Sequence, residues 1–516
     1  MSKSKILSFY PKPAARGKSS IPLNLMAIVR MFDSKRFAYS IVNGTVDRDY
    51  VTQIRKKIRE EDILCVGITT MTGYQIYDGL RVAREIKKIR SDIPIIWGGY
   101  HPTLLPLETL EDPCVDIVVK GQGEISFKEV VEALAADAEL KNIKGIAYKN
   151  SSGELVNNPD RTFIALDVFP SLIKVFDLSN YVQMLPLWGR TLDYYTSQGC
   201  TFECGFCAEN KFSKKRWVTL SSIRVVDEIE FIAKRYFLNS IRLVDSNFFV
   251  NKRRVIDICN EILRRNINIK FIGVNARIDT LLKYEDDVWE LLYRAGFREL
   301  LVGAESGNDE VLKIINKNIT AEDTLNFFDR ATKYGFKVWV SLMIGIPGFN
   351  TDKELHDTVT LLDKMLTSKN QCVSGSAIFQ YTPYPGSKLF NVAIQYGFKP
   401  ASSFAGWSKM NLHNMHLPWV KKKYKNYVNY ITLYILRRLI APVYPRTKVL
   451  RIVYQHLLDP ILKWRWDNRY FSYFFLEKVM MDFFNFLGAL KERVSESSLF
   501  SRGKKNTGNK CSKEIC

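Results

Sequence analysis

Three thiols lie in the stretch Cys200-Thr-Phe-Glu-Cys204-Gly-Phe-Cys207, within eight residues of a 516-residue chain. A loop of this length can wrap one cube of iron and sulfide and supply thiolates to three of its four irons. The fourth iron would stay open for a substrate or cofactor. A structural zinc site needs a fourth ligand, and no Cys or His lies within twenty residues on either side. The spacing therefore predicts an iron–sulfur site at Cys200, Cys204 and Cys207.

This spacing, C-x3-C-x2-C with the aromatic Phe206 before the last cysteine, resembles the motif of the radical SAM superfamily. The resemblance implies a [4Fe–4S] cluster whose open iron binds the amino and carboxylate groups of S-adenosylmethionine (SAM). One electron from a low-potential donor such as ferredoxin or flavodoxin would then release a 5′-deoxyadenosyl radical. In such enzymes the cofactors carry the chemistry, and the protein supplies position and a dry cavity.

Length and composition predict a protein of two or three domains without a membrane-spanning helix. The apolar fraction of 46% is sufficient for sizeable cores. The nine cysteines are mostly single and scattered, which is typical of a reducing compartment, so we expect a cytoplasmic protein. We expect no secretory signal, because the short apolar run near the start lacks a long hydrophobic core, and the sequence contains no run of about 18 uncharged apolar residues. The net charge of +21 calls for a partner such as nucleic acid, an anionic membrane surface or an acidic substrate.

Residues 1–140 alternate short apolar runs with amphipathic stretches, which predicts an α/β domain with a doubly wound parallel sheet. Informative loops follow three predicted strands, Ile63–Thr69, Ile93–Trp97 and Asp116–Val119. Ligands bind at such carboxyl ends, where glycine lets them approach the backbone. The candidate ligand-binding residues of these loops are Thr69, Thr70, Thr72, Gly73, Gly98, Gly99, His101, Gly121, Gly123 and Glu124.

With the cysteine motif downstream, this region resembles the Rossmann-like cobalamin-binding domain that precedes the radical domain in cobalamin-dependent radical SAM enzymes. The resemblance implies that the three loops bind cobalamin. No D-x-H-x-x-G segment is present to supply an axial imidazole. His101 is therefore a candidate axial ligand, a contact of the cobalamin tail, or a plain loop residue.

Residues 141–190 are predicted to form a linker, in which Ile143–Tyr148 and Glu154–Val156 could make a hairpin. Strand–helix alternation returns over residues 191–400 and predicts a partial (β/α)6 barrel, whose working residues lie at the carboxyl ends of the strands. The cysteine loop follows the first strand, as that architecture requires. The expected strands are Leu192–Ser197, Ser240–Leu243, Lys270–Val274, Glu299–Val302, Lys337–Met343 and Gly375–Gln380.

Polar or glycine-bearing segments follow the other five strands, and their order resembles the radical SAM barrel. By that resemblance the SAM-binding candidates are Asp245 and Asn247 at the amino-group site, Arg277, Glu305 and Ser306 at the carboxylate, amino group or ribose, and Gly345 and Tyr381 at the adenine. Purely structural explanations exist for each segment. Asp and Asn often cap helices, Gly-Pro turns close barrels, and Arg277 could simply pair with Glu305.

Residues 401–500 are predicted to be α-helical, followed by a disordered tail at 501–516. Residues 401–516 contain 21 Lys and Arg against 7 Asp and Glu, with interleaved aromatic residues. The pattern fits nucleic-acid binding, a peripheral contact with the inner face of an anionic membrane, or a helical cap over the barrel. No RNA-binding module is recognisable, which argues against nucleic acid.

These features predict a cobalamin-dependent radical SAM enzyme with a small-molecule substrate. The resemblance implies methylation of an unactivated carbon, and the aromatic, basic C-terminal region favours a hydrophobic, lipid-like intermediate as the substrate. Oxidative cyclisation, as in the anaerobic cyclase of bacteriochlorophyll synthesis, and ring rearrangement use the same cofactors without methyl transfer. An RNA-modifying enzyme and a non-enzymatic iron–sulfur or cobalamin sensor are the remaining alternatives.

Overall fold

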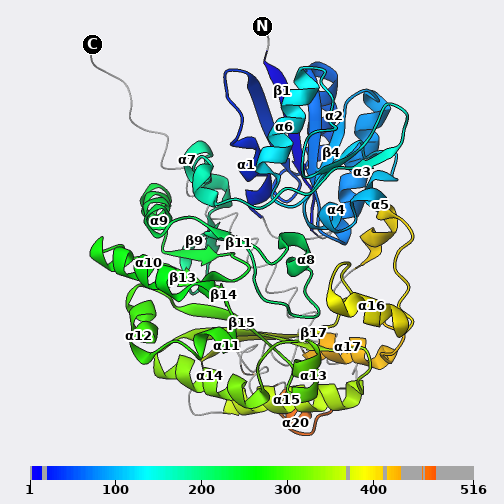
Figure 1. The fold of residues 1–516 in the computed structure, drawn as a ribbon. Helices are drawn as coiled ribbons and strands as arrows, with labels where there is room; N and C mark the ends of the chain where they lie inside the picture. Colours follow the sequence, from blue (N-terminus) through cyan, green and yellow to red (C-terminus); the bar gives the residue numbers. More distant parts are fainter. Residues whose placement is uncertain are drawn as a thin grey trace. The chain divides into compact units, whose positions relative to one another are not determined.

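A computed structural model describes residues 3–13, 20–367, 372–410, 415–431, 452, 456 and 459–471 (Figure 1). Its N-terminal part is a seven-stranded sheet with the strand order β2-β1-β3-β4-β5-β6-β7. The strands are β1 (Ser4–Tyr10), β2 (Phe37–Asn43), β3 (Ile63–Thr69), β4 (Ile95–Gly98), β5 (Ile117–Val119), β6 (Ile146–Lys149) and β7 (Leu155–Asn157). The first five strands are parallel, and the order reverses between β1 and β3 as in doubly wound folds.

Strands β6 and β7 form an antiparallel hairpin that continues this sheet beyond β5. The sequence analysis anticipated a hairpin here but placed it in a linker that starts at residue 141. The sheet instead extends to Asn157, because Ile146 and Ala147 are fully buried and β6 pairs with β5 along Ile117–Val119.

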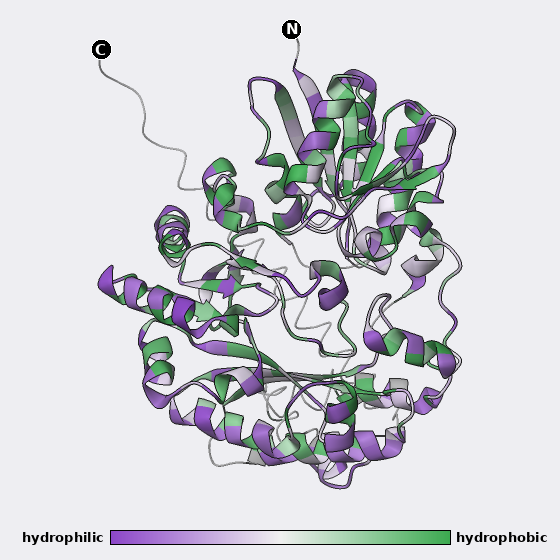
Figure 2. Ribbon diagram, viewed as in Figure 1, coloured by the Kyte–Doolittle hydropathy of each residue, from purple (hydrophilic) through white to green (hydrophobic). Residues whose placement is uncertain are grey.

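Helices cover both faces of the N-terminal sheet (Figure 1). They are α1 (Leu23–Val29), α2 (Tyr50–Glu60), α3 (Tyr74–Ile89), α4 (Tyr100–Leu104), α5 (Pro106–Leu110) and α6 (Gly123–Ala135). Side chains alternate along a strand, so Leu7 and Phe9 join the core beneath α2 and α3, whereas Ile6 joins the core beneath α1 and α6. Figure 2 shows the helices with their polar residues turned away from the strands.

The second α/β region contains two four-stranded sheets with the orders β13-β12-β9-β8 and β14-β15-β16-β17. Its strands are β8 (Gln183–Leu185), β9 (Gly189–Tyr194), β12 (Ser240–Leu243), β13 (Lys270–Ile272), β14 (Val274–Ala276), β15 (Glu299–Glu305), β16 (Lys337–Ile344) and β17 (Val373–Gln380). Gly273, with φ of 56°, separates β13 from β14 within one predicted strand. Strands β9, β12 and β13 pair in parallel, as do β14, β15 and β16, which gives the succession expected of the partial barrel.

The first predicted barrel strand, Leu192–Ser197, is in fact two elements. Strand β9 ends at Tyr194, and β10 (Ser197–Gly199) pairs with β11 (Trp217–Thr219) instead. The chain changes partner because the Thr196 amide donates to the Asp245 carboxylate rather than to a neighbouring strand. This turn carries the chain into the cysteine loop.

The helices of this region lie between the strands, as the alternation predicted. They are α8 (Glu209–Ser213), α9 (Ser222–Tyr236), α10 (Lys252–Arg264), α11 (Ile278–Leu281), α12 (Asp286–Arg294), α13 (Asp309–Ile314), α14 (Ala321–Lys333), α15 (Thr351–Thr367) and α16 (Lys388–Gln395), with α7 (Leu172–Val175) preceding β9. Helix α14 begins at a capping box, in which the Thr320 hydroxyl accepts from the Asp323 amide.

Only part of the predicted helical region after residue 400 is described. A 3-10 helix, η4 (Phe404–Lys409), is followed by α17 (Lys422–Tyr430) and α20 (Asp459–Asp467). Most of the predicted helical region 401–500 and the whole tail 501–516 lie outside the described residues. Among the helices that are described, none combines the length and apolarity needed to cross a membrane.

Candidate active site

The cysteine loop begins at a glycine that no other residue could replace without rearrangement. Gly199 has φ of +86°, and a Cβ there would lie 2.1 Å from the Arg216 carbonyl oxygen. Further along, the Gly205 amide donates to the Ile315 carbonyl at 2.7 Å, and the Leu389 amide donates to the Gly205 carbonyl at 2.9 Å. Backbone hydrogen bonds from distant segments therefore fix the loop around its three thiols.

The three thiols of this loop are free and lie in a partly or fully buried position. The Nη1 of Arg277 donates to the Cys204 sulfur at 2.9 Å. Burial, together with the neighbouring Cys204, Glu209 and Cys200, raises the pKa of Cys207 to about 12, although a hydrogen bond from the Glu209 backbone opposes the shift. Burial likewise raises the pKa of Cys200, with Cys204 contributing. The three sulfurs are thus near enough to one another to interact electrostatically.

This donor set fits an iron–sulfur cluster. Thiolates are the usual ligands of such clusters, and iron binding would displace the thiol protons that burial otherwise retains. The Arg277 guanidinium complements the negative charge of a thiolate-bound cluster. In the part of the chain that the structure describes, no group of three or more Cys, His, Asp or Glu is placed to hold a single metal ion. A cluster differs from such a site, because its three cysteines each bind a separate iron.

Arg277 and Glu305, which the sequence suggested might pair, have different partners. The Arg277 guanidinium binds Asp279 at 2.8 Å and the Lys317 carbonyl at 2.7 Å, and it lies 4.0 Å from the centre of the Phe202 ring. Glu305 instead pairs with the Lys317 ammonium at 2.7 Å and adopts φ of +63° at an irregularity of β15. Both predicted residues are buried beside the cysteine loop.

The remaining predicted SAM contacts are buried at the ends of their strands. The Asp245 carboxylate accepts hydrogen bonds from the Thr196 amide and hydroxyl and from Ser197, and burial raises its pKa. Asn247 caps η3 (Phe248–Val250), and its Nδ2 has no partner within the described chain. Asp245 thus braces the turn before the cysteine loop, whereas Asn247 keeps a free donor.

The last three SAM candidates lie in well-packed surroundings. The Ser306 hydroxyl accepts from the Asn308 amide at 3.1 Å, and Tyr381 is fully buried. The Gly345 amide donates to Glu354 at 2.8 Å, and its carbonyl accepts from Trp419 at 2.9 Å. Burial raises the pKa of Glu354 to about 7.

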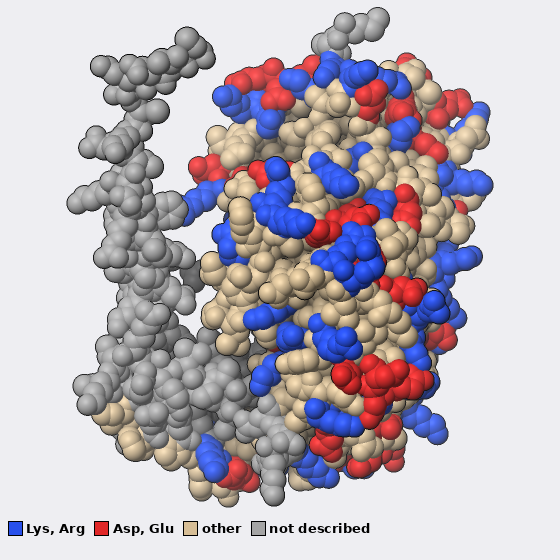
Figure 3. Space-filling model, turned by 90° about the vertical axis from the view of Figure 1, so that its left-hand side faces the viewer, with Lys and Arg blue, Asp and Glu red and all other residues tan. Residues whose placement is uncertain are grey.

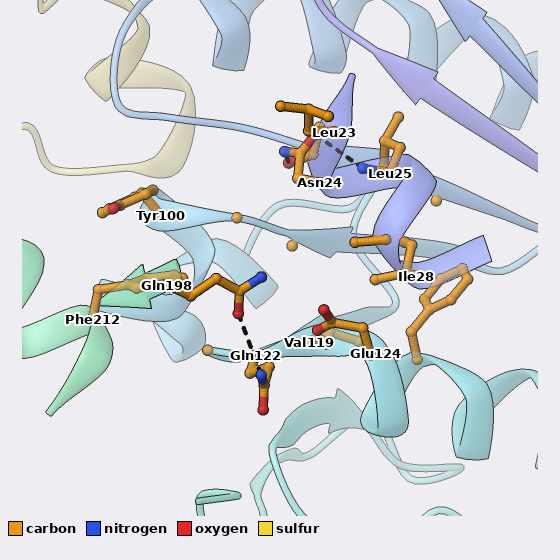
Figure 4. Close-up of a pocket in the computed structure, with 18 of the residues that line it drawn as sticks. Leu23, Asn24, Leu25, Ile28, Tyr100, Val119, Gln122, Glu124, Gln198 and Phe212 are labelled. Carbon is orange, nitrogen blue, oxygen red and sulfur yellow. Dashed lines mark hydrogen bonds between the residues drawn. The ribbon is translucent and has the colours of Figure 1, made fainter. Parts of the chain in front are cut away.

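A cavity of about 330 Å³ lies at the carboxyl ends of the N-terminal strands (Figure 4). Six of the predicted cobalamin-binding residues line it, namely Thr69, Gly98, Gly99, Gly121, Gly123 and Glu124. The opposite wall comes from residues that immediately precede or follow the cysteine loop and from the loop after β12, and includes Tyr195, Gln198, Glu209, Phe212 and Ser246. The cavity is therefore shared by the two α/β regions.

Two polar contacts in the cavity wall involve side chains missed by sequence reasoning. The Nε2 of Gln122 donates to the Oε1 of Gln198 at 3.3 Å (Figure 4). This hydrogen bond joins the loop that follows β5 to strand β10. Glu124 pairs with Arg30 at 3.4 Å, and both side chains are only 3% exposed. Burial raises the pKa of Glu124, although Arg30 opposes the shift. Asn24 and Ile28 of α1 complete this wall and carried no sequence signal of their own.

Four of the predicted cobalamin contacts, Thr70, Thr72, Gly73 and His101, do not line the cavity. His101 is fully buried, its Nδ1 lies 2.9 Å from the Thr72 hydroxyl, and its ring stacks on Phe404 at 5.4 Å. Burial lowers its pKa to about 3. Because η4 covers the imidazole and His101 does not line the cavity, the structure favours the third alternative, a loop residue without a cobalamin contact, over an axial or tail-binding role.

The cavity fits a bulky, mostly uncharged cofactor. Two of its lining loops, Gly98–Gly99 and Gly121–Gly123, carry glycines, and Gly98 has no atom nearer than 3.6 Å to a built Cβ. Its remaining lining is mainly apolar, with amide, hydroxyl and carboxylate groups at intervals. A corrin ring with a nucleotide tail, which combines apolar faces with neutral amide side chains, suits this lining.

Family models match both α/β regions. Residues 194–362 match the model of the Radical SAM superfamily, and residues 14–131 match the model of the B12 binding domain. The chain belongs to the cobalamin-dependent radical SAM enzymes, whose cofactors are SAM, a [4Fe–4S] cluster and cobalamin. The predicted fold class and cofactors are confirmed, and the sensor alternative is not supported.

The chain is 30% identical over 386 residues to an uncharacterised methyltransferase of Pyrococcus horikoshii, a match that covers 73% of this chain and 79% of the relative. It is 26% identical over 343 residues to the anaerobic magnesium-protoporphyrin IX monomethyl ester cyclase of Rubrivivax gelatinosus, covering 66% and 60%. The structure of the radical SAM methyltransferase TsrM from Kitasatospora setae, with cobalamin and a [4Fe–4S] cluster bound, superposes with a TM-score of 0.63 at 17% identity, covering 79% and 81%. This last similarity concerns the fold.

Proposed function

We propose that this enzyme transfers a methyl group to a carbon atom of a neutral, largely apolar small molecule. The observation that supports the proposal most strongly is the shared cavity, whose walls come from the cobalamin-domain loops and from the flanks of the cysteine loop. When bound, the cluster with SAM supplies the adenosyl radical, and cobalamin supplies the methyl group.

The character of the cavity wall supports the substrate class. No Lys, Arg or His lines the cavity among the residues described, so an anionic substrate group would find no charged partner there. Apolar residues such as Leu25, Ile28 and Phe127 form much of the wall and exclude water. Water exclusion protects radical chemistry from side reactions.

Anaerobic product analysis tests the proposal. The protein would be reconstituted with iron, sulfide and hydroxocobalamin, reduced with dithionite and supplied with SAM and a candidate substrate. Methyl transfer predicts both 5′-deoxyadenosine and S-adenosylhomocysteine, with a Cys204→Ala variant as the inactive control. Absence of S-adenosylhomocysteine alongside abundant 5′-deoxyadenosine would contradict methyl transfer.

Oxidative cyclisation is a second candidate, because the cyclase of Rubrivivax gelatinosus is 26% identical over 66% of this chain. It uses the same two domains without consuming a methyl group. The same product analysis separates the two reactions, since cyclisation leaves S-adenosylhomocysteine at background. A low-potential ferredoxin or flavodoxin would replace dithionite as the electron donor in either case.

We further propose a peripheral membrane contact through the basic region after residue 400, much of which lies outside the described residues. In α20, Ile461 and Trp464 are 49% and 58% exposed, and Lys463 lies between them. Elsewhere the charges are mixed, and Figure 3 shows Lys and Arg interspersed with Asp and Glu on one face. We expect the protein to co-sediment with anionic vesicles but not with neutral ones. Failure to co-sediment with anionic vesicles would refute the proposal.

A further inference from the structure

Glu209 connects the cysteine loop to the cavity through two different parts of the same residue. It is the first residue of α8, two positions after Cys207. Its backbone amide donates a hydrogen bond to the Cys207 thiol, and its side chain lines the shared cavity. No sequence motif singled this residue out.

The Glu209 carboxylate is held by hydroxyl groups and not by a cation. The Tyr100 hydroxyl, from the first residue of α4, donates to it, and the Ser246 hydroxyl, from the loop after β12, hydrogen-bonds to both Glu209 and Tyr100. Burial raises the pKa of Glu209, and these hydrogen bonds oppose the shift. The Tyr100 ring also stacks on Phe212 with 4.2 Å between ring centres. Among the described residues no Lys or Arg forms an ion pair with Glu209, which is only 8% exposed. The carboxylate is therefore fixed in position at the cavity wall.

Hydrogen bonding at this carboxylate is incomplete. A carboxylate offers about four acceptor positions, and the hydroxyls of Tyr100 and Ser246 occupy at most two of them. A buried charge without a cation is costly unless hydrogen bonds compensate it. The free positions therefore favour a ligand that brings hydrogen-bond donors without bringing negative charge.

The ligand of this cavity carries such donors. A corrin ring is surrounded by primary amide side chains, each of which has two N–H donors and no charge. The glycine loops Gly98–Gly99 and Gly121–Gly123 line the same cavity as Glu209. We propose that the Glu209 carboxylate, oriented by Tyr100 and Ser246, accepts a hydrogen bond from an amide side chain of cobalamin.

The consequence is that the cysteine loop itself takes part in cobalamin binding. The residue that hydrogen-bonds a cluster ligand through its backbone contacts the corrin periphery through its side chain. Glu209 is in this sense a positioning residue, which sets where the corrin lies relative to Cys207. The inference concerns cofactor binding alone, so its test does not depend on whether the enzyme catalyses methyl transfer or cyclisation.

Spectrophotometric titration of the anaerobic protein with hydroxocobalamin tests the contact without reference to turnover. Glu209→Ala is expected to raise the Kd about tenfold, which corresponds to about 1.4 kcal/mol. The matched control is Glu228→Gln, because Glu228 is also buried and accepts a tyrosine hydroxyl, that of Tyr194 at 2.7 Å, but does not line this cavity. The control should bind like the wild type, and an unchanged Kd for Glu209→Ala would overturn the proposal.

A second titration remains decisive even if Glu209→Ala fails to fold. Cobalamins with one propionamide hydrolysed to a carboxylate would place negative charge against Glu209. The wild type should bind at least one such isomer about tenfold more weakly than cobalamin itself, and Glu209→Gln should remove that discrimination. Equal discrimination by the wild type and Glu209→Gln would show that the carboxylate faces no corrin amide.

Discussion

Gly99 offers a sharp test of the cobalamin side of the cavity. It lines the cavity with φ of 95° and ψ of −165°, a backbone conformation that is essentially restricted to glycine. A Cβ at this position would lie 2.7 Å from the Thr70 carbonyl oxygen and 2.9 Å from the Thr69 hydroxyl. Gly99→Ala therefore forces the loops after β3 and β4 apart at the cavity edge.

The expected magnitude follows from two contributions. Holding a non-glycine residue in this conformation costs about 1–3 kcal/mol. Separating the loops also weakens the hydrogen bond from the Thr70 amide to the Gly98 carbonyl, now 2.9 Å, which is worth about 1 kcal/mol. If cobalamin must restore the original loop, the total of about 2–4 kcal/mol raises its Kd about 30-fold to several hundred-fold.

One glycine variant serves as a control in the same hydroxocobalamin titration. Gly153→Ala introduces positive-φ strain in the β6–β7 turn, far from the residues that line the cavity, with no atom within 4 Å of the new Cβ. It should bind cobalamin within about threefold of the wild type and lose about 1 kcal/mol of stability. Wild-type affinity in Gly99→Ala, with an intact fold by circular dichroism, would refute the reasoning.

Three further predictions concern other parts of the molecule. Gly199→Ala places a Cβ 2.1 Å from the Arg216 carbonyl, so iron content after reconstitution should fall below half of the wild-type value, and full iron loading would contradict this. His101→Phe retains a ring that packs against Phe404 but loses a hydrogen bond worth about 1 kcal/mol, so the stability of the fold should drop slightly. The visible spectrum of bound hydroxocobalamin should stay unchanged, and an altered spectrum would place His101 on cobalt. Burial raises the pKa of Glu354 from 4.5 to about 7, so the folded state binds this proton more tightly than the unfolded state does. The stability that the protonated Glu354 side chain contributes is therefore lost as pH rises through about 7. The melting temperature of the wild type relative to Glu354→Gln should therefore fall between pH 5 and 8, and a constant difference would exclude the effect.

Sequence periodicity predicted both ends of a strongly patterned element correctly. Strand β3 has the predicted bounds Ile63–Thr69, because a buried apolar run leaves few alternatives. Helix α6 begins at Gly123, which the sequence analysis assigned to a loop. Glycine is a weak helix former, so its entry into the first turn depends on tertiary context that propensity does not contain.

The candidate site was predictable where neighbours in sequence are neighbours in space. The three cysteines share one loop, so their spacing alone indicated the cluster. The burial of His101 was not predictable, since Phe404, which covers it, lies about 300 residues downstream. The partners of Glu209 were equally hidden, because Tyr100 precedes it by 109 positions and belongs to the other α/β region.

The most direct measurement of the central claim is the electron paramagnetic resonance spectrum of the reduced, reconstituted protein before and after addition of SAM. A cluster held by Cys200, Cys204 and Cys207 alone leaves one iron open, so about four irons per chain and a SAM-dependent change of the signal are expected. The change should occur with and without cobalamin. A signal that SAM leaves untouched would mean that a protein side chain fills the fourth position, and would contradict the account.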